Sequence, residues 1–160
     1  MARIELSLHV AAPAARCFDL ARSVDAHVRS TAATHEQAVA GRTSGLLALG
    51  DQVTWSARHL GIRQELTSRI TAFERPSYFR DSMVRGVFAH FDHDHFFTPA
   101  HGGTLLRDVF DYRAPFGPLG WLAERLFLSA YMERFLLTRL RELKALAESD
   151  AWAEFLPPAT

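Results

Sequence analysis

The sequence predicts an α+β fold: a curved antiparallel sheet of about seven strands wrapped round a long C-terminal helix, with two short helices after the first strand. Residues 36–113 alternate with a period of two between Gly, Pro and polar breaks. Residues 121–148 repeat apolar side chains at three- and four-residue steps. An antiparallel sheet must cover its apolar face, and this helix is the only large element available to do so. Space left between them predicts an internal cavity.

The N-terminal segment predicts one strand and two short helices. Apolar and polar residues alternate from Arg3 to Val10, which indicates a half-buried strand. Pro13 suits the first turn of a helix, and a second short helix covers about residues 24–32. Cys17, the only cysteine, lies in the apolar stripe of the first helix, so we expect a small buried hydrophobe and no intramolecular disulfide.

Six further strands are predicted by the same alternation. Their ranges are 36–42, 51–60, 62–74, 78–85, 88–98 and 103–113. Leu60-Gly61 has the character of a two-residue turn, which would pair Trp55 with Leu66 across the hairpin. The polar residues of both strands then fall together on one face, so the opposite face is the inner one.

Histidines and aspartates alternate in the stretch FDHDHFF at residues 91–97. The positions shared by aromatics and histidines should face the cavity, and the two aspartates should face away. We therefore expect His93 and His95 to meet carboxylates from neighbouring strands, Asp81 and Asp108. In a regular strand Phe88 and Phe91 would point to opposite faces. A β-bulge within residues 86–90 would allow both to face inward.

The same alternation predicts which side chains face the cavity, where we expect a ligand to bind. It also directs Ala72 and Arg85 inward. The expected ligand-binding residues are Trp55, His59, Gln64, Leu66, Phe79, Asp81, Met83, Phe91, His93, His95, Asp108, Phe110, Tyr112, Leu122 and Leu126. Aromatic rings would supply apolar and stacking surface, and the His/Asp groups would orient the ligand.

Three interpretations of the His/Asp cluster stay open. It is a satisfied polar network that fixes the strand register, a polar anchor for an otherwise apolar ligand, or an acid/base site with Asp81, His93 or Asp108 as the catalytic candidates. Two histidines on one face with a carboxylate would provide three metal ligands, but no cysteine assists and aromatic rings crowd the pair. We expect no metal and no cofactor.

Two apolar segments each have two possible roles. Leu46, Leu47 and Leu49 lie in a glycine-bracketed loop, where they either cap the core or form a lid over the cavity mouth. Phe127, Tyr131 and Phe135 form a stripe beside the inward face of the long helix. They would pack under the short helices or contact a second subunit, which leaves a homodimer as one alternative.

Composition excludes several classes of protein. Lys plus Arg equals Asp plus Glu at 18 each, so no net charge favours nucleic acid. No apolar run approaches the length of a membrane span, and the N-terminus does not resemble a signal peptide, so we expect a cytoplasmic protein without stable membrane insertion. No serine-nucleophile elbow, P-loop or dinucleotide motif occurs. We expect one domain over residues 1–150 and a frayed tail over 151–160.

The order of these elements resembles the helix-grip fold of the START-like, SRPBCC superfamily, which includes birch-pollen-allergen-type, polyketide cyclase/dehydrase and coenzyme Q-binding proteins. The motifs that carry the likeness to its bacterial cyclase/dehydrase-like branch are GRTSG at 41–45, GDQVTW at 50–55, DVFDY at 108–112 and PFGPLG at 115–120. The resemblance implies binding, transport or sequestration of a lipid, quinone or polyketide. The alternatives are a metal-free cyclase/dehydratase-type lyase acting on a polyketide-like or aromatic substrate, and a ligand-free interaction module.

Overall fold

One seven-stranded antiparallel sheet forms the body of the computed structural model, which describes residues 1–158. Its strands are β1 (Ala2–Val10), β2 (Gln37–Gly41), β3 (Gln52–His59), β4 (Ile62–Glu74), β5 (Tyr78–Arg85), β6 (His90–Ala100) and β7 (Gly103–Arg113). They lie in the order β1-β7-β6-β5-β4-β3-β2, so the chain closes the meander by placing its first strand beside its last. The predicted fold class is confirmed.

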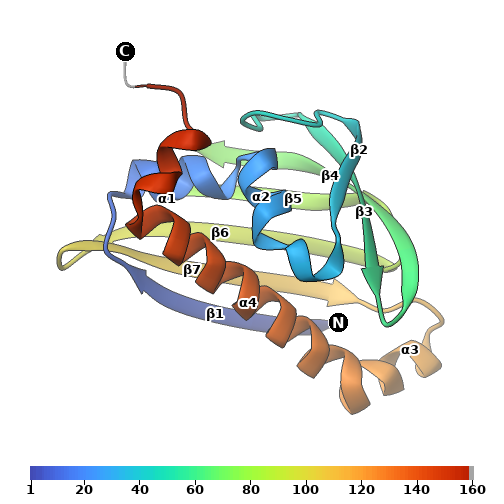
Figure 1. Cartoon of the computed structure of the whole chain (residues 1–160). Coiled ribbons are helices and arrows are strands. Elements are labelled where there is room, and N and C mark those ends of the chain that lie inside the picture. Colours follow the sequence, from blue (N-terminus) through green and yellow to red (C-terminus); the bar gives the residue numbers. More distant parts are fainter. Residues whose placement is uncertain (159–160) are drawn as a thin grey trace.

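The helices gather on one face of this curved sheet (Figure 1). They are α1 (Ala14–Ala21), α2 (Val24–Ser30), the 3₁₀ turn η1 (Ala32–Thr34), α3 (Pro118–Ala123), the π-helical segment η2 (Glu124–Leu128), α4 (Ser129–Glu148) and the 3₁₀ turn η3 (Asp150–Glu154). The long α4 packs against β1, α1 and α2. The helical path from α3 to α4 is continuous but contains one π turn, which the sequence pattern does not predict. Among residues 1–158, no helix has both the length and the apolar character that crossing a membrane requires.

The predicted register of the β3–β4 hairpin is confirmed. His59 pairs with Ile62, and Trp55 pairs with Leu66. The turn residues Leu60 and Gly61 have φ of 52° and 77°, as a two-residue hairpin turn of the favoured hand requires.

Three local departures from the simple alternation occur. The register shifts after Ile70, so Ala72 pairs with Arg80 on the outer face and Phe73 turns inward; the prediction of an inward Ala72 was wrong. A second shift near Thr67 leaves Arg85 exposed at the strand end, contrary to expectation. Phe88 lies in a loop between β5 and β6, not in a bulge, and packs against the buried Phe91 and Phe110.

The densest part of the core surrounds Phe18 of α1. Its ring is fully buried and meets Phe73, Phe79 and Phe97 edge-on at centroid distances of 5.2 to 5.4 Å. Cys17 beside it is buried, as expected. A second cluster around Tyr112 and α4 borders the other half of the sheet.

The C-terminal segment differs from the frayed tail that the sequence suggested. Trp152, Phe155 and Leu156 pack against the core cluster that contains Phe18. Arg16 lies over the Trp152 ring at 4.1 Å from its centroid, which ties this segment to α1. Residues 159–160, the end of the expected tail, lie outside the described part of the chain.

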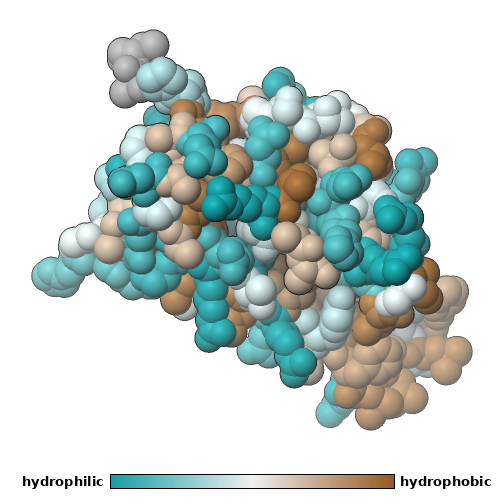
Figure 2. Space-filling view, viewed as in Figure 1, coloured by the Kyte–Doolittle hydropathy of each residue, from teal (hydrophilic) through white to brown (hydrophobic). Residues whose placement is uncertain are grey.

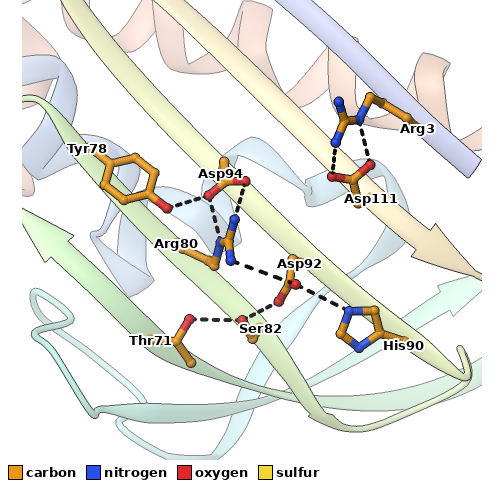
Figure 3. A network of polar contacts seen from close by, with 9 residues as sticks. All are labelled: Arg3, Thr71, Tyr78, Arg80, Ser82, His90, Asp92, Asp94 and Asp111. Atoms are coloured by element: carbon orange, nitrogen blue, oxygen red, sulfur yellow. Dashed lines mark hydrogen bonds and ion pairs between the residues drawn. The ribbon is translucent and has the colours of Figure 1, made fainter. Parts of the chain in front are cut away.

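The outer face of the sheet carries a polar network (Figure 3). Asp94 accepts hydrogen bonds from Arg80 through both carboxylate oxygens and from the Tyr78 hydroxyl. Asp92 accepts one from Ser82 and lies beside His90. The two aspartates of FDHDHFF therefore point away from the cavity, as predicted.

Candidate functional site

A cavity of about 400 Å³ separates the inner face of the sheet from the α3–α4 helical segment. Its volume falls within the range of about 300–1,000 Å³ that is usual for small-molecule sites. Most of the wall is aromatic or aliphatic. The side chains that form it include Trp55, Ala57, Leu66, Phe88, Phe91, Phe110, Leu128, Met132, Phe135 and Leu136.

The cavity mouth lies where the β3–β4 turn approaches the segment before α3. Leu60, Phe116 and Leu119 line the cavity there and are 60%, 82% and 73% exposed. Figure 2 shows hydrophobic residues gathered over α3 at this end of the molecule. A ligand would enter past an apolar rim.

One end of the cavity is polar. His27 Nε2 lies 2.6 Å from Glu36 Oε1, and the His27 ring stacks on Trp55 at a centroid distance of 4.0 Å. Burial lowers the pKa of His27. Burial alone would raise the pKa of Glu36, but His27 and Arg139 bring it below its usual range. The pair is therefore a neutral imidazole donating to a carboxylate.

Arg139 reaches the same end of the cavity from α4. Within residues 1–158, no carboxylate lies within ion-pair distance of its guanidinium, and no side chain accepts a hydrogen bond from it. A half-buried arginine without an acidic partner can bind a carboxylate, phenolate or carbonyl of a ligand.

The His/Asp cluster forms as predicted, from three adjacent strands. His95 Nδ1 lies 3.1 Å from Asp108 Oδ1, and His93 Nε2 lies 3.4 Å from Asp108 Oδ2. On the opposite side, Asp81 Oδ1 lies 3.7 Å from His95 Nε2 and 3.8 Å from His93 Nδ1. The two imidazoles are thus held between two carboxylates.

The protonation of the cluster follows from this geometry. Burial alone would lower the pKa of His95, but Asp108 and Asp81 raise it to about 9. Burial would raise the pKa of Asp108, yet His95 and His93 hold it far below its usual range. The pKa of His93 is lowered by burial and by the charge on His95. At neutral pH one imidazolium lies between two carboxylates, beside one neutral imidazole.

Hydrogen bonding in the cluster is incomplete. Asp81 Oδ1, His93 Nε2 and His95 Nε2 are buried and have no hydrogen-bond partner among the described residues. A register-fixing network would be expected to satisfy its members. The free atoms therefore leave the cluster able to contact something further. Asp81 and His93 line the main cavity, so that contact can come from the ligand side.

The structure brings most of the predicted ligand-binding residues to the large cavity. Those that line it are Trp55, His59, Gln64, Leu66, Asp81, Phe91, His93 and Phe110. Five others face the interior without lining it: Phe79, Met83, His95, Asp108 and Tyr112. Of these, Phe79 and His95 line a small adjoining pocket. Asp108 supports the histidines, and Tyr112 shares a hydrogen bond with Ser129.

Leu122 and Leu126 were wrongly predicted to line the cavity. They are 45% and 71% exposed because the π turn over Glu124–Leu128 inserts one residue into the helical repeat. Before α4 the cavity is lined instead by Ala123 and, at its exposed mouth, by Leu119. Glu124 also turns inward, where its carboxylate accepts a hydrogen bond from the Ala114 amide.

The loop that was a lid candidate does not line the main cavity. Leu46, Leu47 and Leu49 are absent from the cavity wall; Leu47 is buried in the core and Leu49 is exposed. Hydrogen bonds join Leu47 to Arg22 and Val24 to Gly45, so the loop is fastened to α1 and α2. This arrangement matches the alternative in which the loop caps the core.

Several cavity residues could not be predicted from the sequence. Phe127, Tyr131 and Phe135 line the cavity and do not form a separate stripe, and Tyr131 shares a hydrogen bond with His59. His27 and Glu36 were not predicted, although a histidine in a short helix nine residues before an acid at a strand start was a visible signal. Arg139 is one of several arginines on α4, and the sequence does not distinguish it.

The model of the family described as "Polyketide cyclase / dehydrase and lipid transport" matches residues 1–148. A search of curated proteins found no match.

Similar solved structures share the fold at low sequence identity. The protein TTHA0849 from Thermus thermophilus is 16% identical with a TM-score of 0.74, over 90% of this chain and 95% of that one. The di-domain ARO/CYC StfQ from the steffimycin biosynthetic pathway is 15% identical with a TM-score of 0.73, over 91% of this chain and 50% of that one. Major latex-like protein 151 from Panax ginseng is 14% identical with a TM-score of 0.66, over 92% and 98%.

Proposed function

Because the chain belongs to the polyketide cyclase/dehydrase and lipid transport family, we propose that it binds a small amphipathic molecule inside the cavity between sheet and helix. The observation that carries this proposal is the division of the cavity wall. Aromatic and aliphatic side chains form most of it, while Arg139, His27, Glu36, Asp81 and His93 gather at one end. Such a wall suits a ligand with an apolar body and one polar group.

The ligand's apolar part would lie along Trp55, Phe91, Phe110 and the α4 side chains. Its polar group would meet Arg139, which favours an acidic or carbonyl oxygen at that end. Lipids with an acidic head, quinones and polyketides satisfy this description. The ligand-free interaction module is disfavoured, because about 400 Å³ far exceeds the roughly 30 Å³ that one liquid water occupies.

The test uses a matched pair of substitutions on β3. Ala57→Trp places an indole inside the cavity, whereas Arg58→Trp places the same indole on the exposed outer face one residue away. Binding of the anionic aromatic probe 1-anilinonaphthalene-8-sulfonate would be followed by fluorescence titration, with native mass spectrometry of the purified chain to identify co-purified molecules.

We expect Ala57→Trp to weaken probe binding by at least about tenfold, a loss of roughly 1.4 kcal/mol, and Arg58→Trp to leave it unchanged. Arg139→Gln should weaken the sulfonate probe more than a neutral aromatic probe. Equal affinity in the two tryptophan variants, with both folded by circular dichroism, would contradict binding in the cavity.

A second candidate function is a cyclase/dehydratase-type reaction in the same cavity. The unpartnered Asp81 and His93 atoms at its wall favour it, since a group that shuttles a proton must be free to reach the substrate. If His93→Ala keeps probe and ligand affinity but abolishes turnover of a bound polyketide-like or aromatic substrate, the chain is an enzyme. Loss of affinity without any turnover in the unsubstituted chain favours the binding protein.

A further inference from the structure

The His/Asp cluster presents three inward-directed donor groups around one point. One donor atom from each of Asp81, His93 and His95 lies within 4.8 Å of the others. Asp81 Oδ1 is 3.7 Å from His95 Nε2 and 3.8 Å from His93 Nδ1. Tetrahedral zinc sites with bonds of about 2.0–2.1 Å separate their ligands by roughly 3.3 Å, so the two Asp81 separations exceed that value by only about 0.5 Å.

The ring nitrogens that point away from the proposed ion lie near a carboxylate, as is usual for metal-binding histidines. Asp108 lies behind both rings, with Oδ1 at 3.1 Å from His95 Nδ1 and Oδ2 at 3.4 Å from His93 Nε2. A carboxylate on the far nitrogen fixes the tautomer and leaves the near nitrogen's lone pair directed at the ion. Here Asp108 does this for His95 through a hydrogen bond, and it lies within ion-pair distance of the far nitrogen of His93.

The burial and charge of the cluster point the same way. Both histidines are 3% exposed, and Asp81 Oδ1 and His95 Nε2 lack hydrogen-bond partners in the described chain. A metal ion at this point would replace the proton of the His95 imidazolium, and its two positive charges would then balance the carboxylates of Asp81 and Asp108. Arg139 lines the small pocket beside Asp81 and His95, so its positive charge faces the same group.

We propose that Asp81, His93 and His95 bind one divalent transition-metal ion, with Asp108 as the shared partner of both histidines. Zinc is the simplest occupant, since two imidazoles and one carboxylate are a ligand set it accepts with a position left open. Asp81 and His93 line the main cavity, so the open position faces the ligand space. This inference reverses the expectation of no metal drawn from the sequence, where crowding by aromatic rings argued against one.

The test titrates the full chain with Co²⁺ after chelator treatment, and follows the visible absorption of the bound ion. We expect one Co²⁺ per chain, displacement by Zn²⁺ and a higher unfolding temperature with Zn²⁺ bound. Asp81→Asn and His93→Gln should each weaken binding by at least about tenfold, and Asp108→Asn by about 10–100-fold.

His90→Gln is the matched control. His90 lies on the same strand beside an aspartate, with its Nε2 3.3 Å from Asp92 Oδ2, but on the outer face (Figure 3). It should leave Co²⁺ binding unchanged. Circular dichroism establishes that each variant is folded. The Co²⁺ titration of the unsubstituted chain shows by itself whether a metal ion binds.

Two results would overturn the proposal: no saturable one-to-one binding by the unsubstituted chain, or equal affinity in the His93→Gln and Asp81→Asn variants and in the His90→Gln control. Neither bears on the proposed ligand, because probe binding is measured separately on chelator-treated protein. A chain that binds the probe but not Co²⁺ keeps its proposed function and loses its metal site.

Discussion

Three acids on the inner face of the sheet lie beside histidines. Glu36 meets His27, Asp108 meets His95, and Asp81 lies between His93 and His95. A buried carboxylate is costly unless a hydrogen bond or opposite charge compensates it. Pairing with histidine makes that compensation depend on pH within a range that experiments can reach.

The His27–Glu36 pair predicts a loss of stability in mild acid. The pKa of His27 is lowered by burial from its ordinary 6.5, so the unfolded chain binds a proton there before the folded chain does. Stability from this group is present above 6.5 and is lost as pH falls through the lowered folded value. Glu36 adds a further loss below its ordinary 4.5.

Urea unfolding midpoints measured from neutral pH down to mild acid check this prediction. His27→Gln should flatten the pH dependence in the upper part of that range, at the cost of some stability at neutral pH. The exposed His101 is a control, and His101→Gln should keep the slope of the unsubstituted chain. An unchanged slope in His27→Gln would count against the assignment.

The alternation of side chains along a strand explains for which residues the direction, inward or outward, could be predicted. Along β6 the sequence alternates regularly, so the placement of His93 and His95 inward and of Asp92 and Asp94 outward was correct. Glu36 precedes β2 and has no strand neighbour to fix its direction. Periodicity therefore predicts the direction of side chains better in the middle of an element than at its ends.

At the scale of elements, the boundaries of the helical stretch were predicted well but its inward face was not. Leucines occur at several angles round this helix, so the pattern tolerates more than one inward face. A π turn changes that face by one residue without changing the composition. In α4, which follows the π turn, Met132, Leu136 and Leu140 are buried, as their spacing in the sequence predicted.

The start of α3 depends on a close approach that only glycine permits. A Cβ atom at Gly120 would lie 2.0 Å from the Pro115 carbonyl oxygen, which is backbone and cannot rotate away. We expect Gly120→Ala to displace α3 and destabilise the fold by about 1–3 kcal/mol. Denaturant unfolding measures the loss, and probe titration reports the effect on the nearby mouth.

Leu119→Ala provides the comparison for this glycine. Leu119 is its sequence neighbour and is largely exposed, so truncation should change stability by no more than about 0.5 kcal/mol. If both variants were equally stable, the close contact at Gly120 would have no energetic importance.

At the scale of the whole molecule, packing and binding occupy different halves of the same sheet. One half holds the aromatic core round Phe18, and the other encloses the cavity. The helix-grip architecture could be predicted because period-two strands and one long helix have few ways to cover each other. The His27, Glu36 and Arg139 part of the cavity's polar end could not be predicted, because these residues meet from three separate segments of the chain.

This division predicts unequal costs for two equal truncations. Phe18→Ala removes a fully buried ring with three aromatic neighbours and should cost about 3–5 kcal/mol. Phe135→Ala removes a ring that already borders open space and should cost less than half as much. Denaturant unfolding of both variants decides the matter, and similar losses would show that the cavity is filled by packing in solution.

The π turn has a consequence for how such proteins diversify. Deleting one residue within Glu124–Leu128 would restore the ordinary helical repeat and swing Leu122 and Leu126 from the surface toward the interior. The internal chamber would change its shape, because a different set of side chains from α3 and η2 would then form its wall. Descendants of this sequence can therefore acquire a new size preference through a change in chain length, a step that comparisons of aligned positions alone would overlook.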